Sequence, residues 1–402
     1  MKLLVLSRVF PNAVQPTYGL FVRERMFRVA RHIPLVVVAP VAWFPGQGLI
    51  RRFWNPHYRP PVPCHEVQDG IDVYHPRFLC IPGIMKWTDG PLLALSLLRL
   101  VRQLKRDQDI TGIDAHFIYP DGVAAWLLGR WLNLTRTITL RGTILRISRT
   151  RLCRWMSARA MHAAARVFSV SGDLRRVALD MGIAENQVQV MPNGINLDYF
   201  YPEDRATCRQ ELRLPEDAKV LITVGGLNER KGFHRVIEQM PALLRRFPNL
   251  HYLCVGGGGP DGNGQAWLEG LAREQGVQDH VHFTGATAPE RLRFYYSAAD
   301  VFVLATRFEG WANVFLEAAA CGLPTVTTRV GGNPEVICSD ALGTLVELGD
   351  GDALRDAIEE ALTTDWDHAA IQAYARENRW EARIPILVDA LRSAHSAQPP
   401  AH

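Results

Sequence analysis

Two glutamates eight positions apart, Glu309 and Glu317, have the chemistry to bind a ligand that carries hydroxyl groups. Residues 301–305 form an apolar run typical of a buried strand, and residues 313–321 show the pattern of a helix. Glu309 would then follow the carboxyl end of the strand, and Glu317 would lie early in the helix. Open α/β sheets bind ligands at this edge. The sequence therefore predicts that the two carboxylates face one crevice.

The helix predicted after this strand adds a second kind of contact. We expect Asn313 to cap it and Gly322 to end it. The free backbone N–H groups of its first turn make a site for a phosphate. A carboxylate beside an anion site suits a ligand with both phosphates and hydroxyls, and a sugar nucleotide has both.

A second segment has a spacing that suits a phosphate ligand. The strand predicted at 220–224 runs into Gly225 and Gly226, and the adjacent cations Arg230 and Lys231 follow. Glycine lets a backbone approach a ligand, and two cations can neutralise the charge that builds on a diphosphate leaving group. Taken alone, the segment is also typical of a solvated basic turn. Its predicted place in the same sheet, two strands from the Glu309 loop, favours the ligand site.

Neither a metal ion nor a nicotinamide cofactor is predicted. The Asp-x-Asp sequences at 107–109 and 350–352 both coincide with predicted helix ends, where aspartates act as caps. The seven cysteines are odd in number and show no Cys-x-x-Cys spacing. This usage favours a reducing cytoplasm without disulfides or a zinc site.

The first half of the chain offers two weaker candidates. His116 ends a predicted strand, and Gly19 precedes a predicted helix. A lone histidine in a strand is more often a packed, hydrogen-bonded residue than a catalytic one, and a glycine there is compatible with a simple turn. The alternatives are a contact of His116 with substrate and the approach of a backbone N–H near Gly19 to a phosphate.

Strand and helix patterns alternate along the 402 residues, as in parallel sheets with helices on both faces. The length is too great for one core, and Asn-Gly and two prolines in 192–202 break the pattern. We expect an N-terminal domain at 1–198, a C-terminal domain at 199–378, and a helix at 379–395 that packs back on the N-terminal domain. No apolar run is long enough to predict a membrane-spanning helix.

The net charge of +4 is unevenly distributed. No Asp, Glu or Lys occurs between Gly122 and Gly172, whereas nine arginines do: 130, 136, 141, 146, 149, 151, 154, 159 and 166. Two interpretations stay open, a solvated face in a lysine-poor protein or a surface that docks on anionic lipid. A second cluster suits either a membrane interface or a lid over a cleft, and comprises Trp43, Phe44, Ile50, Arg51, Arg52, Phe53, Trp54 and Tyr58. The arginine run has few aromatics, which disfavours a nucleic-acid partner.

Together these segments resemble the retaining glycosyltransferases of family 4, which have the GT-B architecture of two Rossmann-like parallel-sheet domains facing a central cleft. The E-x7-E spacing of Glu309 and Glu317, followed by Pro324, is the most specific feature of the resemblance. The other segments that carry it are 18–25, 114–116, 140–143, 168–171, 191–194, 225–227 and 230–232. The resemblance covers nearly the whole chain.

The resemblance implies a role for each candidate residue. Glu317 would hold the ribose hydroxyls, Glu309 would lie by the donor sugar, and Arg230 with Lys231 would clamp the diphosphate. The remaining donor contacts would come from backbone groups, at Gly19, Gly226, Ala312, Asn313 and Val314. His116 would contact the donor sugar or the acceptor across the cleft.

Three positions depart from the family pattern. Gly226 stands where arginine is frequent, so the clamp would depend on Arg230, and Ile144 and Asn196 replace common aspartates on the acceptor side or hinge. None of these changes affects the glutamate pair. Because base contacts in such folds are largely made by the backbone, the side chains do not distinguish the donor base, the sugar or the acceptor.

The resemblance thus implies a metal-independent hexosyl transfer, with retention, from a UDP- or GDP-sugar to a hydroxyl acceptor. The arginine-rich and aromatic segments favour a glycan or lipid-linked acceptor in cell-surface polysaccharide biosynthesis. The enzyme would then work in the cytoplasm or as a peripheral protein on the inner face of the cell membrane. The alternatives are a sugar-nucleotide epimerase or phosphorylase of the same fold, and a non-catalytic protein that binds sugar nucleotide or membrane.

Overall fold

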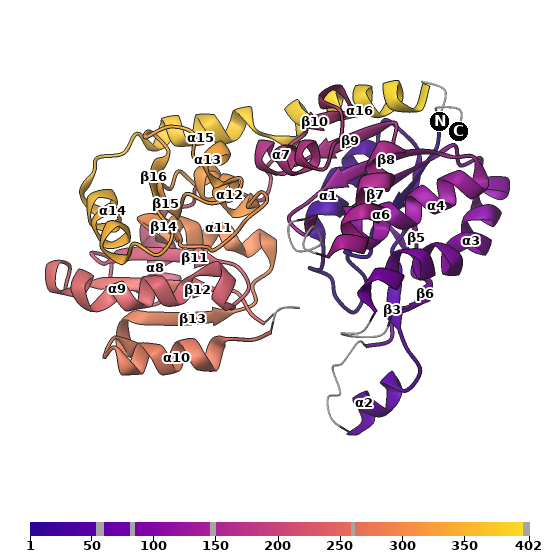
Figure 1. Ribbon diagram of the computed structural model, residues 1–402. Coiled ribbons are helices and arrows are strands. Elements are labelled where there is room, and N and C mark those ends of the chain that lie inside the picture. The colour runs from indigo at the N-terminus through magenta and orange to yellow at the C-terminus, as the bar shows by residue number, and fades with distance from the viewer. Residues whose placement is uncertain (54–59, 81–84, 145–149, 259–261, 397–402) are drawn as a thin grey trace. The chain divides into compact units, whose positions relative to one another are not determined.

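The computed structural model describes residues 1–53, 60–80, 85–144, 150–258 and 262–396, and it contains two α/β units (Figure 1). Unit 1 comprises Met1–Asn193 and Arg383–His402, and unit 2 comprises Gly194–Ala382. Four residues of the charged and aromatic segments, Trp54, Tyr58, Arg146 and Arg149, lie outside the described residues.

The described part of unit 1 is built on an eight-stranded sheet with the order β10-β9-β8-β7-β1-β2-β5-β4. Neighbouring strands are parallel except for β4 and β5. The strands are β1 (Leu3–Leu6), β2 (Leu35–Val38), β4 (His65–Gln68), β5 (Ile71–Tyr74), β7 (Gly112–His116), β8 (Thr135–Leu140), β9 (Arg166–Ser169) and β10 (Val188–Val190). Both β1 and β2 are apolar at every position, as expected for strands that helices cover on both faces.

Helices from the first half of the chain and from its C-terminal end cover the sheet of unit 1. They are α1 (Leu20–Ala30), α3 (Asp89–Gln108), α4 (Val123–Leu132), α6 (Arg151–His162), α7 (Gly172–Asp180) and α16 (Trp380–Ser396). Helix α16 begins in unit 2 and then packs on unit 1, where Arg392 donates a 3.2 Å hydrogen bond to the carbonyl of His32. The His395 ring also lies so close to Gly112 that no side chain would fit there.

Two short strands and a short helix extend from the carboxyl edge of the unit 1 sheet. Strands β3 (Val41–Trp43) and β6 (Arg77–Leu79) pair in parallel just after β2 and β5 end. Between β3 and β4 lies the short helix α2 (Gln47–Phe53). The sequence did not predict β3 and β6, because three-residue strands of mixed polarity carry too short a pattern.

Unit 2 contains a six-stranded sheet with the order β13-β12-β11-β14-β15-β16, parallel throughout. Its strands are β11 (Lys219–Val224), β12 (Leu250–Val255), β13 (Val281–Gly285), β14 (Val301–Leu304), β15 (Thr325–Thr328) and β16 (Gly343–Val346). The chain moves outward from β11 to β13 and then returns to place β14 on the other side of β11. This reversal is a topological switch point, where open sheets bind ligands.

Each face of this sheet carries its own apolar core. One core joins alternate strand residues to α9 (Phe233–Arg246), α10 (Gln265–Glu274) and α14 (Gly351–Thr363). The other joins them to α8 (Arg205–Glu211), α11 (Pro289–Ala298), α12 (Asn313–Ala320) and α15 (His368–Glu377). The predicted α/β class with two parallel-sheet domains is confirmed. Within the described ranges, no helix is both long and apolar enough to cross a bilayer.

Candidate active site

Two loops of unit 2 meet at the switch point between β11 and β14. The first contains the short 3-10 helix Glu229–Lys231, and the second joins β14 to α12. The carbonyl of Arg230 accepts hydrogen bonds from Arg307 N at 2.8 Å and from Thr306 Oγ1 at 2.9 Å. Strands β11 and β14 are direct neighbours, so the loops are closer than the two-strand separation that the sequence predicted.

Gly232 allows these loops to pack tightly. Its φ is +81°, and a Cβ at this position would lie 1.9 Å from the carbonyl oxygen of Ala305. Only glycine tolerates both the left-handed conformation and the close approach. The glycine after Arg230 and Lys231 thus fixes where both cations lie.

The carboxylate of Glu309 binds both cations. Its Oε1 lies 2.8 Å from Arg230 Nη1 and 2.8 Å from Lys231 Nζ, and the residue is only 9% exposed. Burial by itself would raise the pKa of Glu309, but the charges of Lys231 and Arg230 outweigh it and hold that pKa below its usual value. Glu309 is therefore ionised at neutral pH and orients the two cations.

The backbone of Glu309 is also held, by a Gly-Gly pair after β15. Gly332 N donates a 3.1 Å hydrogen bond to the carbonyl of Glu309. Gly331 has a φ of +51°, and a Cβ there would come within 2.0 Å of the same oxygen. The sequence analysis missed this support, although a Gly-Gly pair directly after a predicted strand was a visible signal of close backbone approach.

Glu317 has a different environment from Glu309. Tyr296 on α11 donates a 2.9 Å hydrogen bond to Glu317 Oε2. Burial raises the pKa of Glu317 to about 7, although the bond from Tyr296 and the charge of Lys231 act in the opposite direction. Lys231 therefore acts on both carboxylates. At neutral pH one member of the pair is ionised and the other is close to its titration point.

Helix α12 begins as predicted, but its cap differs. Ala312 occupies the cap position with extended dihedral angles, and Asn313 is the first helical residue, so the prediction that Asn313 caps the helix is wrong. A capping residue must itself be non-helical, and this condition is met one residue earlier. Ala312 offers no side-chain cap to the amides of the first turn. Gly322, with a φ of +81°, follows the end of the helix as expected.

In unit 1, His116 lies at the end of β7 in a fully buried polar cluster. Its Nε2 is 3.2 Å from Asp114 Oδ2, and Arg141 Nη2 donates to its Nδ1 at 3.3 Å. Burial lowers the pKa of His116 to about 4, with Asp114 opposing and Arg141 adding to the shift. The imidazole is therefore neutral at pH 7 and serves as a hydrogen-bonding group.

Gly19 lies at the same carboxyl edge of the unit 1 sheet, because β1 and β7 run parallel. It precedes α1 with a φ of +81°, and a Cβ would lie 2.4 Å from the carbonyl oxygen of Val9. The loop after β1 is tied to the loop after β7 by Asp121, whose Oδ1 accepts a 2.7 Å bond from Arg8 N. Burial raises the pKa of Asp121, although Arg8 opposes the shift.

Among the residues that the structure describes, no group of three or more His, Cys, Asp or Glu side chains could hold a metal ion. The second Asp-x-Asp sequence has the structural role that the sequence predicted. Asp350 caps α14, where its carboxylate accepts a 2.9 Å hydrogen bond from Ala353 N.

Comparison with known proteins identifies the family. Residues 204–378 match the family model described as glycosyl transferases group 1, and residues 41–199 match glycosyltransferase family 4. A D-inositol 3-phosphate glycosyltransferase of Corynebacterium urealyticum is 30% identical over 322 residues, which covers 74% of each chain. The chain is a family 4 glycosyltransferase. The predicted family is thereby confirmed.

Further proteins are similar to this family 4 glycosyltransferase in sequence or in fold. A putative teichuronic acid biosynthesis glycosyltransferase of Bacillus subtilis, TuaC, is 28% identical and covers 83% of this chain and 82% of its own. Sucrose-phosphate synthase of Thermosynechococcus elongatus has a TM-score of 0.79 at 21% identity, with 99% and 100% of the chains covered. HepE of Anabaena, solved with UDP-glucose, has a TM-score of 0.74 at 18% identity, with 98% and 100% covered. The two structures show the GT-B fold.

The structure brings most of the predicted donor residues of this glycosyltransferase to one edge of unit 2. Glu309, Arg230 and Lys231 are in contact, Lys231 influences Glu317, and Gly226 lies in the turn directly after β11. Sequence reasoning did not find the supporting residues Thr306, Tyr296 and Arg141. Asp114 could have been paired with His116 in advance, because residues two apart in a strand share a face.

Proposed function

We propose that this glycosyltransferase moves a hexosyl group from a UDP- or GDP-sugar to a hydroxyl of a glycan or lipid-linked acceptor. Transfer would retain the anomeric configuration and need no metal ion. The observation that carries the proposal is the pair of cations that Glu309 orients next to the first turn of α12 and Glu317. Positive charge and the amides of a helix's first turn at one sheet edge suit a diphosphate leaving group.

Each side chain has a defined part in this reaction. The bond between the anomeric carbon and the diphosphate oxygen breaks, and the acceptor oxygen forms a bond to the same carbon. Arg230, Lys231 and the amides of Ala312, Asn313 and Val314 neutralise the charge that develops on the diphosphate, which also accepts the acceptor's proton. Glu317 accepts hydrogen bonds from the ribose. Glu309 keeps both cations in place and lies by the donor sugar.

The contributions of unit 1 are part of the same proposal. Gly19 lets a backbone N–H approach the diphosphate, and His116 contacts the donor sugar or the acceptor. Because its imidazole is held neutral, His116 would act in orientation and not as a cationic acid. The cluster with Asp114 and Arg141 fixes the ring orientation.

A place in cell-surface polysaccharide assembly is supported by the similarity to the putative teichuronic acid biosynthesis glycosyltransferase of Bacillus subtilis. A peripheral location at the inner face of the cell membrane is supported by helix α6. Arg151, Leu152, Arg154 and Trp155 are exposed on this helix, a combination of cations and apolar side chains that suits an anionic bilayer surface. Arg154 itself donates a 3.2 Å hydrogen bond to the carbonyl of Asp180, and Arg136 and Arg166 of the same run also donate to backbone carbonyls within unit 1.

The proposal is tested by incubating the protein with UDP- and GDP-hexoses, with and without lipid-linked glycan acceptors, in EDTA. Proton NMR of the product reports its anomeric configuration. We expect acceptor-dependent release of nucleoside diphosphate, a product with the donor's configuration, and no loss of rate in EDTA. An inverted product or abolition by EDTA would contradict the proposed chemistry. Conversion of the donor without acceptor would instead indicate an epimerase.

A further inference from the structure

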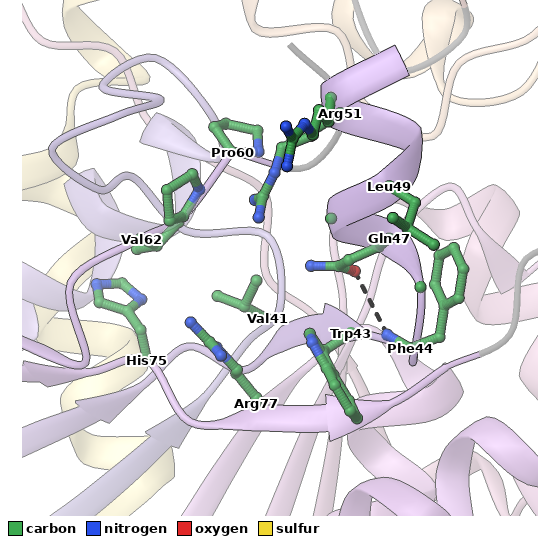
Figure 2. A pocket seen from close by; sticks show the side chains of 14 residues that line it. Val41, Trp43, Phe44, Gln47, Leu49, Arg51, Pro60, Val62, His75 and Arg77 are labelled. Carbon is green, nitrogen blue, oxygen red and sulfur yellow. Dashed lines mark hydrogen bonds between the residues drawn. The ribbon is translucent and has the colours of Figure 1, made fainter. Parts of the chain in front are cut away.

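A cavity of about 570 Å³ in unit 1 has no part in the donor chemistry described above. Helix α2, strands β3 and β6 and the segment 60–62 enclose it (Figure 2). Its volume falls within the range of small-molecule sites. A ligand of moderate size would therefore fit.

The cavity lies at the functional edge of the unit 1 sheet. Strands β3 and β6 follow the carboxyl ends of β2 and β5, which pair in parallel with each other. Strand β2 also pairs in parallel with β1, and β1 with β7. The loop that holds Gly19 leaves from this same edge, and His116 ends β7 there. The cavity is thus placed on the side of unit 1 where a substrate would bind.

The charged side chains of its described lining are all cationic. Arg51, Arg52 and Arg77 line it, and no carboxylate occurs among the described lining residues. Arg77 extends into the cavity from β6 in Figure 2, and Arg52 lines it from the last turn of α2. The lining residue His75 contacts a carboxylate behind it, because its Nε2 lies 2.9 Å from Glu66 Oε1. Arginines gathered in a hollow focus positive potential and match phosphate geometry.

Much of the remaining lining is apolar and partly open to solvent. It includes Val41, Trp43, Phe44 and Val62, together with Leu49, which is 58% exposed. Phe53, at the end of α2, is 65% exposed. Apolar side chains beside a cationic hollow fit an amphiphile, because its phosphate and its hydrocarbon chain each meet a matching surface.

We propose that this cavity binds the phosphate of a lipid-linked acceptor, with Arg52 and Arg77 on the phosphate and Leu49 and Trp43 along the hydrocarbon chain. The ligand class is a phosphate or diphosphate ester of a long apolar alcohol. This inference rests on the proposed function, because it identifies the part of the acceptor that unit 1 recognises. The donor diphosphate uses a separate set of cations, in unit 2.

The first test measures binding by calorimetry with farnesyl phosphate, kept at monomeric concentration, as the probe. Farnesol lacks the phosphate, and inorganic phosphate lacks the chain. We expect farnesyl phosphate to bind at least roughly tenfold more tightly than either, since each part of the cavity supplies an independent contribution. Equal binding of farnesol would overturn the phosphate assignment. Equal binding of inorganic phosphate would overturn the lipid assignment and leave a free phosphate site.

Matched variants then locate the site. The double change Arg52→Gln and Arg77→Gln should weaken farnesyl phosphate by roughly tenfold or more, since two charge-assisted contacts are lost. The control double change Arg99→Gln and Arg102→Gln removes the same charge from exposed positions on α3 and should leave affinity unchanged. Equal losses in the two pairs would mean a general charge effect and would refute the site.

The apolar part of the cavity lining is tested with a matched pair of leucine variants. Leu49→Ser should weaken the lipid phosphate several-fold, whereas Leu95→Ser, at a leucine of unit 1 that is also 58% exposed, should not. Thermal stabilisation by nucleotide sugars must persist in all these variants. If it persists while farnesyl phosphate binds every variant as it binds the wild type, the cavity assignment alone fails. If the wild type binds no nucleotide sugar, the proposed function itself fails.

Discussion

Replacement of Glu317 by glutamine separates the stability of the protein from its function. The amide keeps the shape of the side chain and can still accept the hydrogen bond from Tyr296. It cannot ionise. Because burial raises the pKa of Glu317 from 4.5 to about 7, the folded protein binds this proton more tightly than the unfolded chain does. The free energy of unfolding of the wild type must therefore fall as pH rises through this interval.

The size of the effect follows from the shift. One pKa unit corresponds to about 1.4 kcal/mol, so ionisation of Glu317 costs the folded wild type about 3 kcal/mol at pH 8 and less than about 1 kcal/mol at pH 5. Glu317→Gln removes this cost. We expect the variant to be more stable than the wild type at pH 8 by up to about 3 kcal/mol, with only a small difference at pH 5.

Urea unfolding at both pH values, followed by tryptophan fluorescence and by circular dichroism, measures the difference. Glu274→Gln, at an exposed glutamate at the end of α10, is the matched control and should show no such dependence. Nucleotide-sugar affinity should fall in Glu317→Gln even where stability rises, because a carboxylate accepts ribose hydrogen bonds more strongly than an amide does. A stability difference that is the same at pH 5 and pH 8 would refute the reasoning.

Three further predictions concern other parts of the two units. Asp114→Asn leaves the buried guanidinium groups of Arg25 and Arg141 without their acidic neighbour, so we expect unit 1 to lose about 3 kcal/mol at pH 7 in urea unfolding. The pKa of Asp114 is held below its usual value because His116 and its hydrogen bonds outweigh burial, so the loss should shrink on acidification below about pH 4. An unchanged difference at low pH would contradict this assignment. Gly232→Ala forces a Cβ against the Ala305 carbonyl and should lower the melting temperature and weaken nucleotide-sugar binding, and a neutral result would disprove the close approach. Donor binding should release protons between pH 6 and pH 7, since ribose hydroxyls stabilise the ionised form of Glu317; calorimetry in buffers of different ionisation enthalpy measures this, and proton uptake would contradict it.

Helices and strands could be predicted from the sequence where a single hydrophobic pattern extends over the whole element. Strands such as Leu35–Val38 and Val301–Leu304 are continuous apolar runs because parallel strands are buried on both faces. Strands β3, β6 and β16 were not predicted, because each is three or four residues long and carries polar or exposed positions. Their pairing depends on where the longer neighbouring strands end, which local sequence does not encode.

The residues of the candidate site could be predicted where several charged side chains and glycines occur together in a short segment. Arg230, Lys231 and Glu309 stood out as charges beside glycines and a predicted strand end. Their ion pairs, and the unequal pKa values of Glu309 and Glu317, could not be predicted, because they depend on burial and on Tyr296 from a different helix. The sequence placed the cap of α12 one residue too late. Asparagine is a frequent capping residue and alanine is not, so Asn313 was preferred to Ala312.

The central claim is that the loops after β11 and β14 bind the diphosphate of a nucleotide sugar. Thermal melting across a panel of UDP-, GDP- and ADP-sugars tests it most directly, because a ligand that binds only the folded state raises the melting temperature. We predict that at least one donor stabilises the wild type, and that Lys231→Ala loses this shift while Arg273→Ala, an exposed cation in unit 2, keeps it. The absence of any shift at millimolar donor, or a full shift in Lys231→Ala, would contradict the account.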